Sequence, residues 1–179
     1  MADDQTALSL LPPRFADWFA SRGWSLRPHQ AGLIEAAGRG QGGLVIAPTG
    51  GGKTLAGFLP SLAEITERGS GSGIHTLYIS PLKALAVDIA RNLEAPIAEM
   101  GLPVIVETRT GDTPHSKRVR QRQKPPDILI TTPEQVSLLV ADPHAAHLLA
   151  SPDDVEAQFY EALREADLDK LMALWSDDD

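Results

Sequence analysis

The apolar residues in the first part of the chain recur at the spacing of helix faces. A helix is predicted over 13–23, because Phe15, Trp18 and Phe19 fall on one side of it. A second short helix is expected after Pro28, and the glycine-rich stretch 38–43 ends it. A third helix is predicted over 54–66, and its apolar face is formed by Leu55, Phe58, Leu59, Leu62 and Ile65.

Short apolar runs between these helices predict strands. The expected strands are 44–47, 76–80, 104–107 and 128–131. Further helices are expected from Leu82 to about Glu99 and from Pro133 onward, with Thr132 as the cap of the latter. Strands that alternate with helices favour parallel pairing, so the pattern predicts an α/β fold with a parallel sheet and helices on both faces.

Charge is distributed unevenly along the chain. Residues 1–150 hold 14 basic and 14 acidic side chains, whereas 151–179 hold 2 basic and 10 acidic ones, which accounts for the whole net charge of −8. Five positive charges are concentrated within eight residues: Lys117, Arg118, Arg120, Arg122 and Lys124. This run fits either a contact with a phosphate backbone or a solvated basic loop.

Composition excludes several classes of protein. There is no cysteine, and the five histidines lack the spacing of a helical metal site, so a metal held by protein ligands alone is not expected. The chain has no apolar run long enough to span a bilayer, and its start is acidic rather than basic, so we expect a cytoplasmic protein. The run GSGSG at 69–73 predicts a flexible surface loop without function.

The segment 47–54, APTGGGKT, fits a phosphate-binding loop except that Ala47 replaces the first glycine of the pattern. Such a loop follows a strand and opens a helix, so that its backbone N–H groups point at phosphate oxygens. We expect Lys53 to reach the β- and γ-phosphates and Thr54 to bind Mg²⁺, which implies Mg·ATP as the cofactor. The remaining candidate phosphate-binding residues are Pro48, Thr49, Gly50, Gly51 and Gly52. The alternative is a glycine-rich turn that binds nothing.

Several segments together resemble the first RecA-like domain of superfamily 2 DEAD/DEAH-box helicases, and most closely the ligase-associated, Lhr-like DEXH-box DNA helicases. The segments are RPHQ at 27–30, the loop 47–54, SPLKALA at 80–86, TRTGDT at 108–113 and TTPE at 131–134. The resemblance covers about residues 10–150. It makes Ala47 ordinary, and it implies a RecA-like P-loop NTPase fold that binds ATP and DNA.

The resemblance also implies roles for individual residues. Gln30, with Arg27 in the same motif, would read the adenine edge, because an amide both donates and accepts. Three other segments would grip the backbone of single-stranded or partly duplex DNA. Their candidate residues are Pro81, Lys83, Thr110, Gly111, Thr132 and Pro133. Taken alone, these segments also fit strand-ending turns and helix caps. A DNA ligase and a nuclease are partners implied by the resemblance only.

The resemblance ends before the acidic DExH strand that would hold Mg²⁺ and position the attacking water. No such strand is found in the sequence, so the domain 1–150 is expected to be truncated before this Walker B strand. The segment 151–179 predicts a short acidic helical tail that resembles the first two helices of a SnoaL-like domain. Either two unrelated gene pieces join near Ala150 and Ser151, or the tail is a genuine acidic cap.

The sequence therefore predicts the ATP- and DNA-binding portion of an ATP-dependent DNA helicase, which by resemblance works in DNA repair. Whether these residues act as an enzyme stays open, because the DExH motif and the second motor domain are missing. The alternatives are a nucleotide- or DNA-binding module without turnover and a non-functional truncated or fused product. A P-loop kinase would need an acceptor site and a lid, for which there are no candidate residues.

Overall fold

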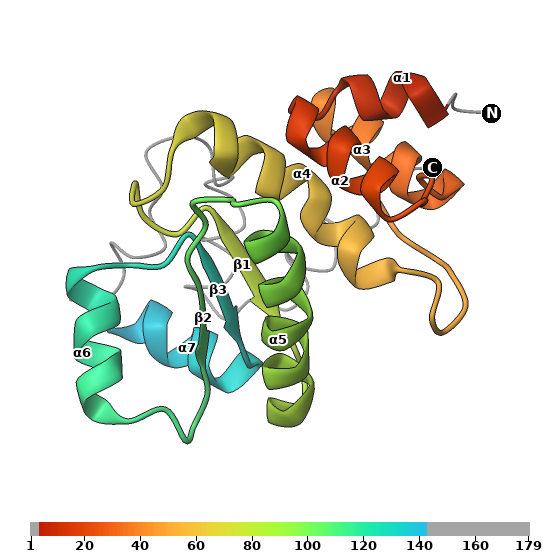
Figure 1. Cartoon of the computed structure of the whole chain (residues 1–179). Coiled ribbons are helices and arrows are strands. Elements are labelled where there is room, and N and C mark those ends of the chain that lie inside the picture. The colour runs from red at the N-terminus through yellow and green to blue at the C-terminus, as the bar shows by residue number, and fades with distance from the viewer. Residues whose placement is uncertain (1–3, 143–179) are drawn as a thin grey trace. The chain divides into compact units, whose positions relative to one another are not determined.

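The computed structural model describes residues 4–142 (Figure 1). The described residues form two compact units, one of 4–70 with 88–105 and the other of 71–87 with 106–142. The predictions about the tail 151–179 and about the joint near Ala150 lie outside the described residues. Within 4–142, no helix has both the length and the apolarity needed to cross a membrane.

The first unit is helical. Its elements are α1 (Asp4–Ser9), α2 (Pro13–Ser21), α3 (Pro28–Gly38), α4 (Lys53–Arg68) and most of α5 (Lys83–Glu99). α3 packs against α4, and α1 packs against both α2 and α3. The helices predicted over 13–23, after Pro28, over 54–66 and from Leu82 are confirmed to within two residues at most described ends, whereas α1 was not predicted.

The core of this unit follows from the predicted helix faces. On α4, the side chains of Phe58, Leu59, Leu62 and Ile65 are all at most 2% exposed. Burying each such side chain stabilises the fold by about 1.5–3 kcal/mol. Trp18 of α2 donates a hydrogen bond from Nε1 to Glu99 Oε2 at 2.7 Å, so a mostly buried indole keeps a polar partner.

The predicted strand 44–47 does not form, and this prediction was wrong. The segment has no ladder partner in the described part of the chain, and Leu44 and Ile46 are 87% and 83% exposed. A strand needs a neighbour to satisfy its backbone groups, and none of the three described strands pairs with this segment. An apolar run alone therefore did not suffice.

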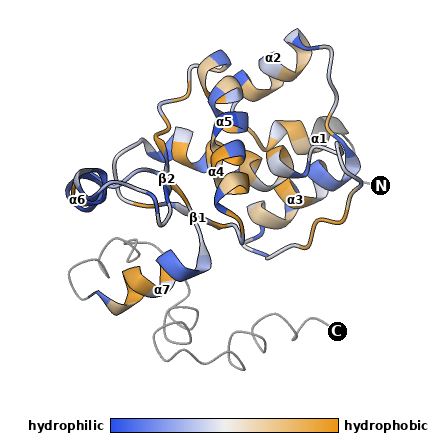
Figure 2. Ribbon diagram, turned by 90° about the horizontal axis from the view of Figure 1, so that it is seen from below, coloured by the Kyte–Doolittle hydropathy of each residue, from blue (hydrophilic) through white to orange (hydrophobic). Residues whose placement is uncertain are grey.

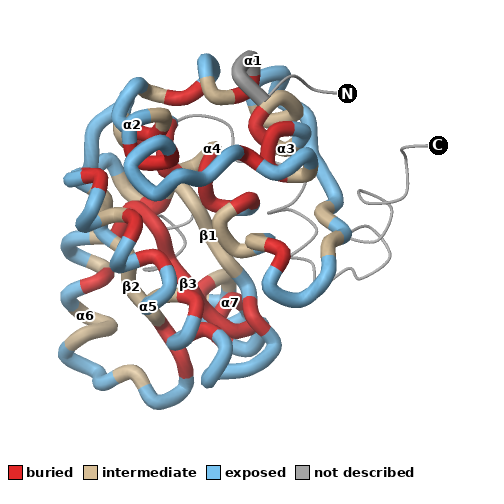
Figure 3. The backbone as a smooth tube through the Cα atoms, turned by 45° about the vertical axis from the view of Figure 1, so that its right-hand side comes forward, coloured by how far each residue is buried: buried red, intermediate tan, exposed pale blue. Residues whose placement is uncertain are grey.

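The second unit contains a three-stranded parallel sheet with the order β1-β3-β2. The strands are β1 (Thr76–Ile79), β2 (Val106–Arg109) and β3 (Ile128–Thr131). Central β3 is buried at all four positions, while β1 and β2 are mostly half-buried (Figure 3). Strand β2 begins and ends two residues later than predicted, and β3 has the predicted bounds. The predicted parallel sheet is confirmed.

Two helices accompany this sheet, α6 (His115–Gln123) and α7 (Pro133–Ala141). Leu139 of α7 packs with Leu129 of β3 and Ile74, which anchors α7 on the sheet. α6 was not predicted, because it is hydrophilic on nearly all sides and lacks an apolar face (Figure 2). The basic run 117–124 is thus largely helical rather than a loop, and its arginines are held by acceptors on the rest of the unit.

Candidate functional site

The glycines of the loop 47–54 have the geometry that a phosphate-binding loop requires. Gly50 and Gly52 have φ values of +76° and +74°, which other residues rarely adopt. A Cβ on Gly51 would lie 2.7 Å from the Pro48 carbonyl oxygen, and one on Gly52 would lie 2.9 Å from Gln30 Nε2. Side chains are therefore excluded where the backbone curls, so the residues present fit a phosphate group.

Lys53 is the first residue of α4, and Gly52 is its N-cap residue. Its exposed ammonium donates hydrogen bonds to the carbonyls of Ala47 at 2.6 Å and Pro48 at 3.2 Å. These contacts hold the cation over the loop, close to the positive end of the α4 dipole. Thr54 follows in the first turn of α4 and is partly exposed, which leaves its hydroxyl accessible to a metal ion. Thr49 lies in the turn that precedes the glycines.

The start of α3 is tied to this loop across more than 20 residues of sequence. Arg27 Nη1 donates to the Gly50 carbonyl at 3.3 Å, and Gln30 Nε2 donates to the Gly52 carbonyl at 3.4 Å. The other end of the Gln30 amide accepts from the Arg27 backbone N–H at 2.9 Å. Gln30 is only 4% exposed, so its amide is fixed rather than solvated. The predicted residues of RPHQ and of the loop are thereby brought together.

A cavity of about 500 Å³ opens beside these residues. Besides Arg27, Gln30, Gly50 and Gly52, its lining includes Phe19, Gly23, Trp24, Ser25 and Leu55. Trp24 is 49% exposed, and the Arg22 guanidinium lies over its ring at 5.1 Å from the centroid, so the tryptophan is held as part of the wall of the cavity. Sequence reasoning missed this apolar wall, because it assigned Phe19 to a helix face and gave Trp24 no role. The sequence did place a tryptophan, Trp24, three residues before Arg27, and this closeness to the predicted adenine motif could have marked it as part of the site.

The second group of predicted residues follows the three strands of the sheet. Segments 80–83, 110–113 and 131–134 begin where β1, β2 and β3 end. Because the strands are parallel, their carboxyl ends lie at one edge, so the sheet brings these three segments together. The Ser80 N–H donates to the Thr131 carbonyl at 2.8 Å, and the Thr131 hydroxyl donates to the Arg109 carbonyl at 2.7 Å. We call these three segments the sheet edge.

Lys83 lies at the centre of the sheet edge. Its ammonium contacts both carboxylate oxygens of Asp112 at 3.1 Å, and a Cβ on Gly111 would lie 3.2 Å from it. The hydrogen bond from Thr132 lowers the pKa of Glu134 below its ordinary value, and the charge of Lys83 lowers it further. The Lys83–Asp112 pair is exposed and therefore weak, so a phosphate can replace the carboxylate.

The predicted residues of the sheet edge differ in exposure. Pro81, Gly111 and Pro133 are exposed, whereas Thr110 and Thr132 are 7% and 1% exposed. The Thr132 hydroxyl donates to Glu134 Oε1 at 2.5 Å instead of capping α7 through its side chain. The two buried threonines shape the edge, and their predicted contact with DNA stays a prediction.

Protein side chains alone do not form a metal site here. Among the residues that the structure describes, no three His, Asp or Glu side chains are grouped so that they could hold a metal ion. A bound Mg²⁺ would instead take its ligands from Thr54, from phosphate oxygens and from water, as is common for this ion.

A profile of the DEAD/DEAH box helicase family matches residues 27–154, which is more than half of the 179 residues. The chain belongs to the DEAD/DEAH box helicase family. Among curated relatives, the Lhr helicase/probable uracil glycosylase of Mycolicibacterium smegmatis is 43% identical over 136 residues, which cover 69% of this chain and 9% of the relative. The Lhr helicase/uracil glycosylase of Escherichia coli K12 is 40% identical over 164 residues, covering 78% of this chain and 10% of the relative.

Solved structures agree with this membership. The structure of Mycobacterium smegmatis helicase Lhr bound to ssDNA and AMP-PNP superposes with a TM-score of 0.76 at 36% identity, covering 94% of this chain and 24% of that one. The DUF1998 helicase MrfA bound to DNA and AMPPNP gives a TM-score of 0.70 at 29% identity, covering 79% of this chain and 20% of that one. The predicted RecA-like α/β fold is confirmed.

The chain thus corresponds to a segment of the helicase core of Lhr-like ATP-dependent helicases. It spans 9–20% of the length of the Lhr relatives it matches. Helicases of this family use ATP, generally with a divalent metal ion.

Proposed function

We propose that this chain binds Mg·ATP at the loop 47–54 and binds the backbone of single-stranded or partly duplex DNA at the sheet edge. The observation that carries the nucleotide half is the pair of hydrogen bonds from Arg27 and Gln30 to the carbonyls of Gly50 and Gly52. They join an amide suited to an adenine edge to a loop suited to phosphates, around a cavity of about 500 Å³.

The base is proposed to lie near Trp24 and Gln30, with the phosphates on the loop. An aromatic ring face and a fixed amide together favour a planar base with donor and acceptor groups. Gly50, Gly51 and Gly52 leave room for phosphate oxygens, and Lys53 turns from the loop carbonyls toward them. Bound Mg²⁺, held in part by Thr54, would neutralise charge on the phosphates.

The DNA half of the proposal depends on the sheet edge. Lys83 offers an exposed ammonium, and the exposed residues Pro81, Gly111 and Pro133 have small or compact side chains, so a DNA strand can approach the protein backbone closely there. Contacts of this kind bind phosphates and do not read bases, which suits a motor that moves along any sequence. DNA-bound relatives of similar fold support the proposal.

These 179 residues by themselves are proposed to bind ATP with little or no turnover and no unwinding, because they contain no DExH sequence. The alternative, a module that holds nucleotide or DNA without turnover, shares both sites and differs only in its biological use. A role in DNA repair, beside a ligase and a nuclease, is proposed from the family resemblance, and a cytoplasmic location is proposed from the amino-acid sequence, as set out above. If affinity purification of the chain recovers neither a DNA ligase nor a nuclease, the proposed partnership with these two enzymes would be rejected.

The test is a titration of the purified chain with fluorescent ATP and Mg²⁺, beside an assay of phosphate release with single-stranded DNA. Lys53→Ala is the loss variant, and Lys124→Ala, a lysine far in sequence from the loop 47–54, is the matched control for nucleotide binding. Saturable binding that Lys53→Ala loses and Lys124→Ala keeps is expected. Absence of binding by the folded wild type would reject the proposal, and Lys53-dependent phosphate release would reject the lack of turnover.

A further inference from the structure

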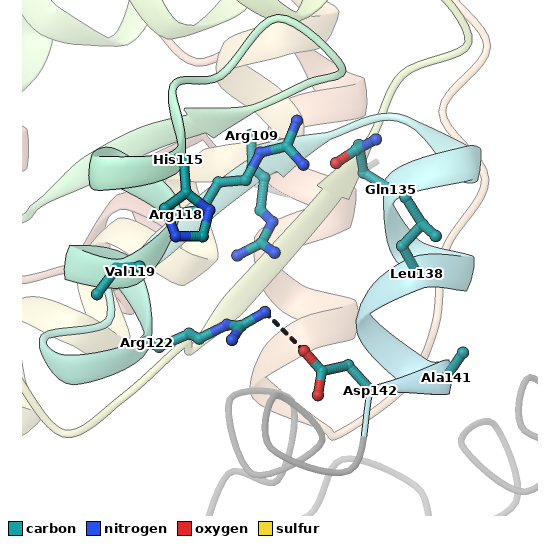
Figure 4. A pocket seen from close by; sticks show the side chains of 9 residues that line it. All are labelled: Arg109, His115, Arg118, Val119, Arg122, Gln135, Leu138, Ala141 and Asp142. Atoms are coloured by element: carbon teal, nitrogen blue, oxygen red, sulfur yellow. Dashed lines mark hydrogen bonds and ion pairs between the residues drawn. The ribbon is translucent and has the colours of Figure 1, made fainter.

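The second unit contains a cavity of about 400 Å³ that neither proposed site uses. It lies between α6 and α7, and its walls come from both helices and from the end of β2 (Figure 4). Its polar lining is dominated by cations: Arg109, Arg118 and Arg122 face one carboxylate, that of Asp142. Packing of two helices does not by itself require three arginine side chains around one cavity.

Arg109 is the central observation. It is the last residue of β2, only 5% of it is exposed, and its guanidinium points into the space between the two helices (Figure 4). Its buried Nε and Nη1 atoms have no hydrogen-bond partner. Buried charged donors are normally paired, because leaving them unpaired costs more than an ordinary lost hydrogen bond. Two charged donors are therefore left unpaired beside the cavity.

The surrounding groups compensate the positive charge of Arg109 only in part. Arg122 Nη2 pairs with Asp142 at 2.6 Å, which uses that carboxylate, while the buried Arg122 Nε has no partner. Arg118 donates only to neutral carbonyls, those of Thr110, Gly111 and Thr113. Burial lowers the pKa of Arg109, the charges of Arg118 and Arg122 lower it further, and the carboxylate of Asp142 offsets only part of this effect. Positive charges therefore outnumber negative ones among the lining side chains.

We propose that the cavity between α6 and α7 is a binding site for a phosphate group, held by Arg109 and Arg122. A phosphate group supplies several acceptor oxygens for the unpaired N–H donors, and arginine forks match that geometry. The buried Gln135 Oε1 also lacks a partner and can accept the proton of inorganic hydrogen phosphate, a proton that a DNA phosphodiester does not have. The phosphate comes either from a small phosphorylated molecule or from the DNA backbone, since Arg118 links this cavity to the Thr110–Gly111 turn of the sheet edge.

The test uses the full chain with Lys53→Ala, so that the nucleotide loop does not contribute and failure of ATP binding does not affect the result. Inorganic phosphate is titrated calorimetrically against this chain at constant ionic strength. Arg109→Gln and Arg122→Gln are compared with Arg120→Gln, a matched control on α6 whose guanidinium pairs with Glu107 outside the cavity. Circular dichroism checks that each variant is folded.

Saturable phosphate binding is expected, weakened about tenfold or more by Arg109→Gln and by Arg122→Gln, because each removes a charged hydrogen bond. Arg120→Gln should change it little. If Arg109→Gln does not fold, Arg122→Gln decides the result, because the partly exposed Arg122 side chain can be replaced with less effect on the fold. Absence of saturable binding, or an equal loss in Arg120→Gln, overturns the proposal. Competition by a single-stranded oligonucleotide identifies DNA as the source of the phosphate, and simultaneous binding identifies a small molecule.

Discussion

The nucleotide loop and the sheet edge bring their residues together by different means. At the sheet edge, three parallel strands in fixed register place three segments side by side. At the nucleotide loop, no paired strand in the described part of the chain positions the residues. Side-chain hydrogen bonds from Arg27 and Gln30 to loop carbonyls hold the start of α3 against the loop instead. The first arrangement depends on backbone pairing and the second on two long side chains.

This difference predicts which changes each region tolerates. A core substitution in the sheet should disturb all three segments at once, because they share β3. The apolar segment before the loop is solvated, so substitutions there should cost little, whereas the loop itself depends on glycine conformation and on single contacts. The following predictions test this contrast, from the largest expected effect to the smallest.

Ile130→Ala in β3 should lower the free energy of unfolding by about 2–5 kcal/mol, because Ile130 is fully buried and its removal leaves a cavity. Leu44→Ala is the matched control and should change it by no more than about 0.5 kcal/mol, since Leu44 is 87% exposed. Urea denaturation followed by circular dichroism measures both. If the two substitutions lowered the free energy of unfolding equally, the contrast between the paired strand β3 and the unpaired segment 44–47 would be wrong.

Gly52→Ala should introduce about 1–2 kcal/mol of backbone strain, since its φ is +74°, and should weaken ATP binding. The new Cβ also meets Gln30 Nε2 at 2.9 Å, so the contact between α3 and the loop has to shift. Gly57→Ala, in open space within α4, should instead stabilise the helix by up to about 1 kcal/mol. Thermal unfolding and nucleotide titration compare them, and unchanged ATP affinity in Gly52→Ala would refute the role of the loop.

Lys83→Ala should weaken DNA binding and reduce the slope of log affinity against log salt concentration by about one, as expected for one lost phosphate contact. ATP binding should be unaffected, because Lys83 belongs to the sheet edge alone. Fluorescence anisotropy with a labelled oligonucleotide at several salt concentrations measures the slope. Arg91→Ala, an exposed cation of α5 outside both the sheet edge and the basic run 117–124, provides the control. An identical slope in wild type and Lys83→Ala would remove Lys83 from the DNA site.

Protonation of Glu99 should have the smallest effect. The hydrogen bond from Arg22 lowers the pKa of Glu99 below its ordinary value, and the bond from Trp18 lowers it further. A carboxylate with a lowered pKa contributes stability above its unfolded pKa and loses it as pH falls through the folded pKa. The free energy of unfolding of wild type should therefore fall more than that of Glu99→Gln as the pH drops below 4.5, the ordinary pKa of a glutamate. Acid titrations of both proteins test this, and parallel curves would contradict it.

Much of the site was accessible from sequence because its signals are local. The loop 47–54, the helix that follows it and β3 depend on glycine, lysine and apolar positions within a few residues of one another. α6 escaped notice because nearly every residue in it is polar, so no periodicity marks it. The cavity lined by Arg109 and Arg122 was equally hidden, since residues 13 positions apart meet only in the folded unit.

The sequence by itself determined that this chain is an α/β protein with a phosphate loop and that a helix follows this loop from about Thr54, because helix faces, short strands and glycine turns are set by neighbouring residues. Only the tertiary structure decided that the apolar run 44–47 stays unpaired, that Gln30 reaches Gly52, and that Arg109 is buried with free donors. Strand pairing, distant side-chain contacts and burial depend on what the rest of the chain places alongside a residue, and local pattern carries no information about that.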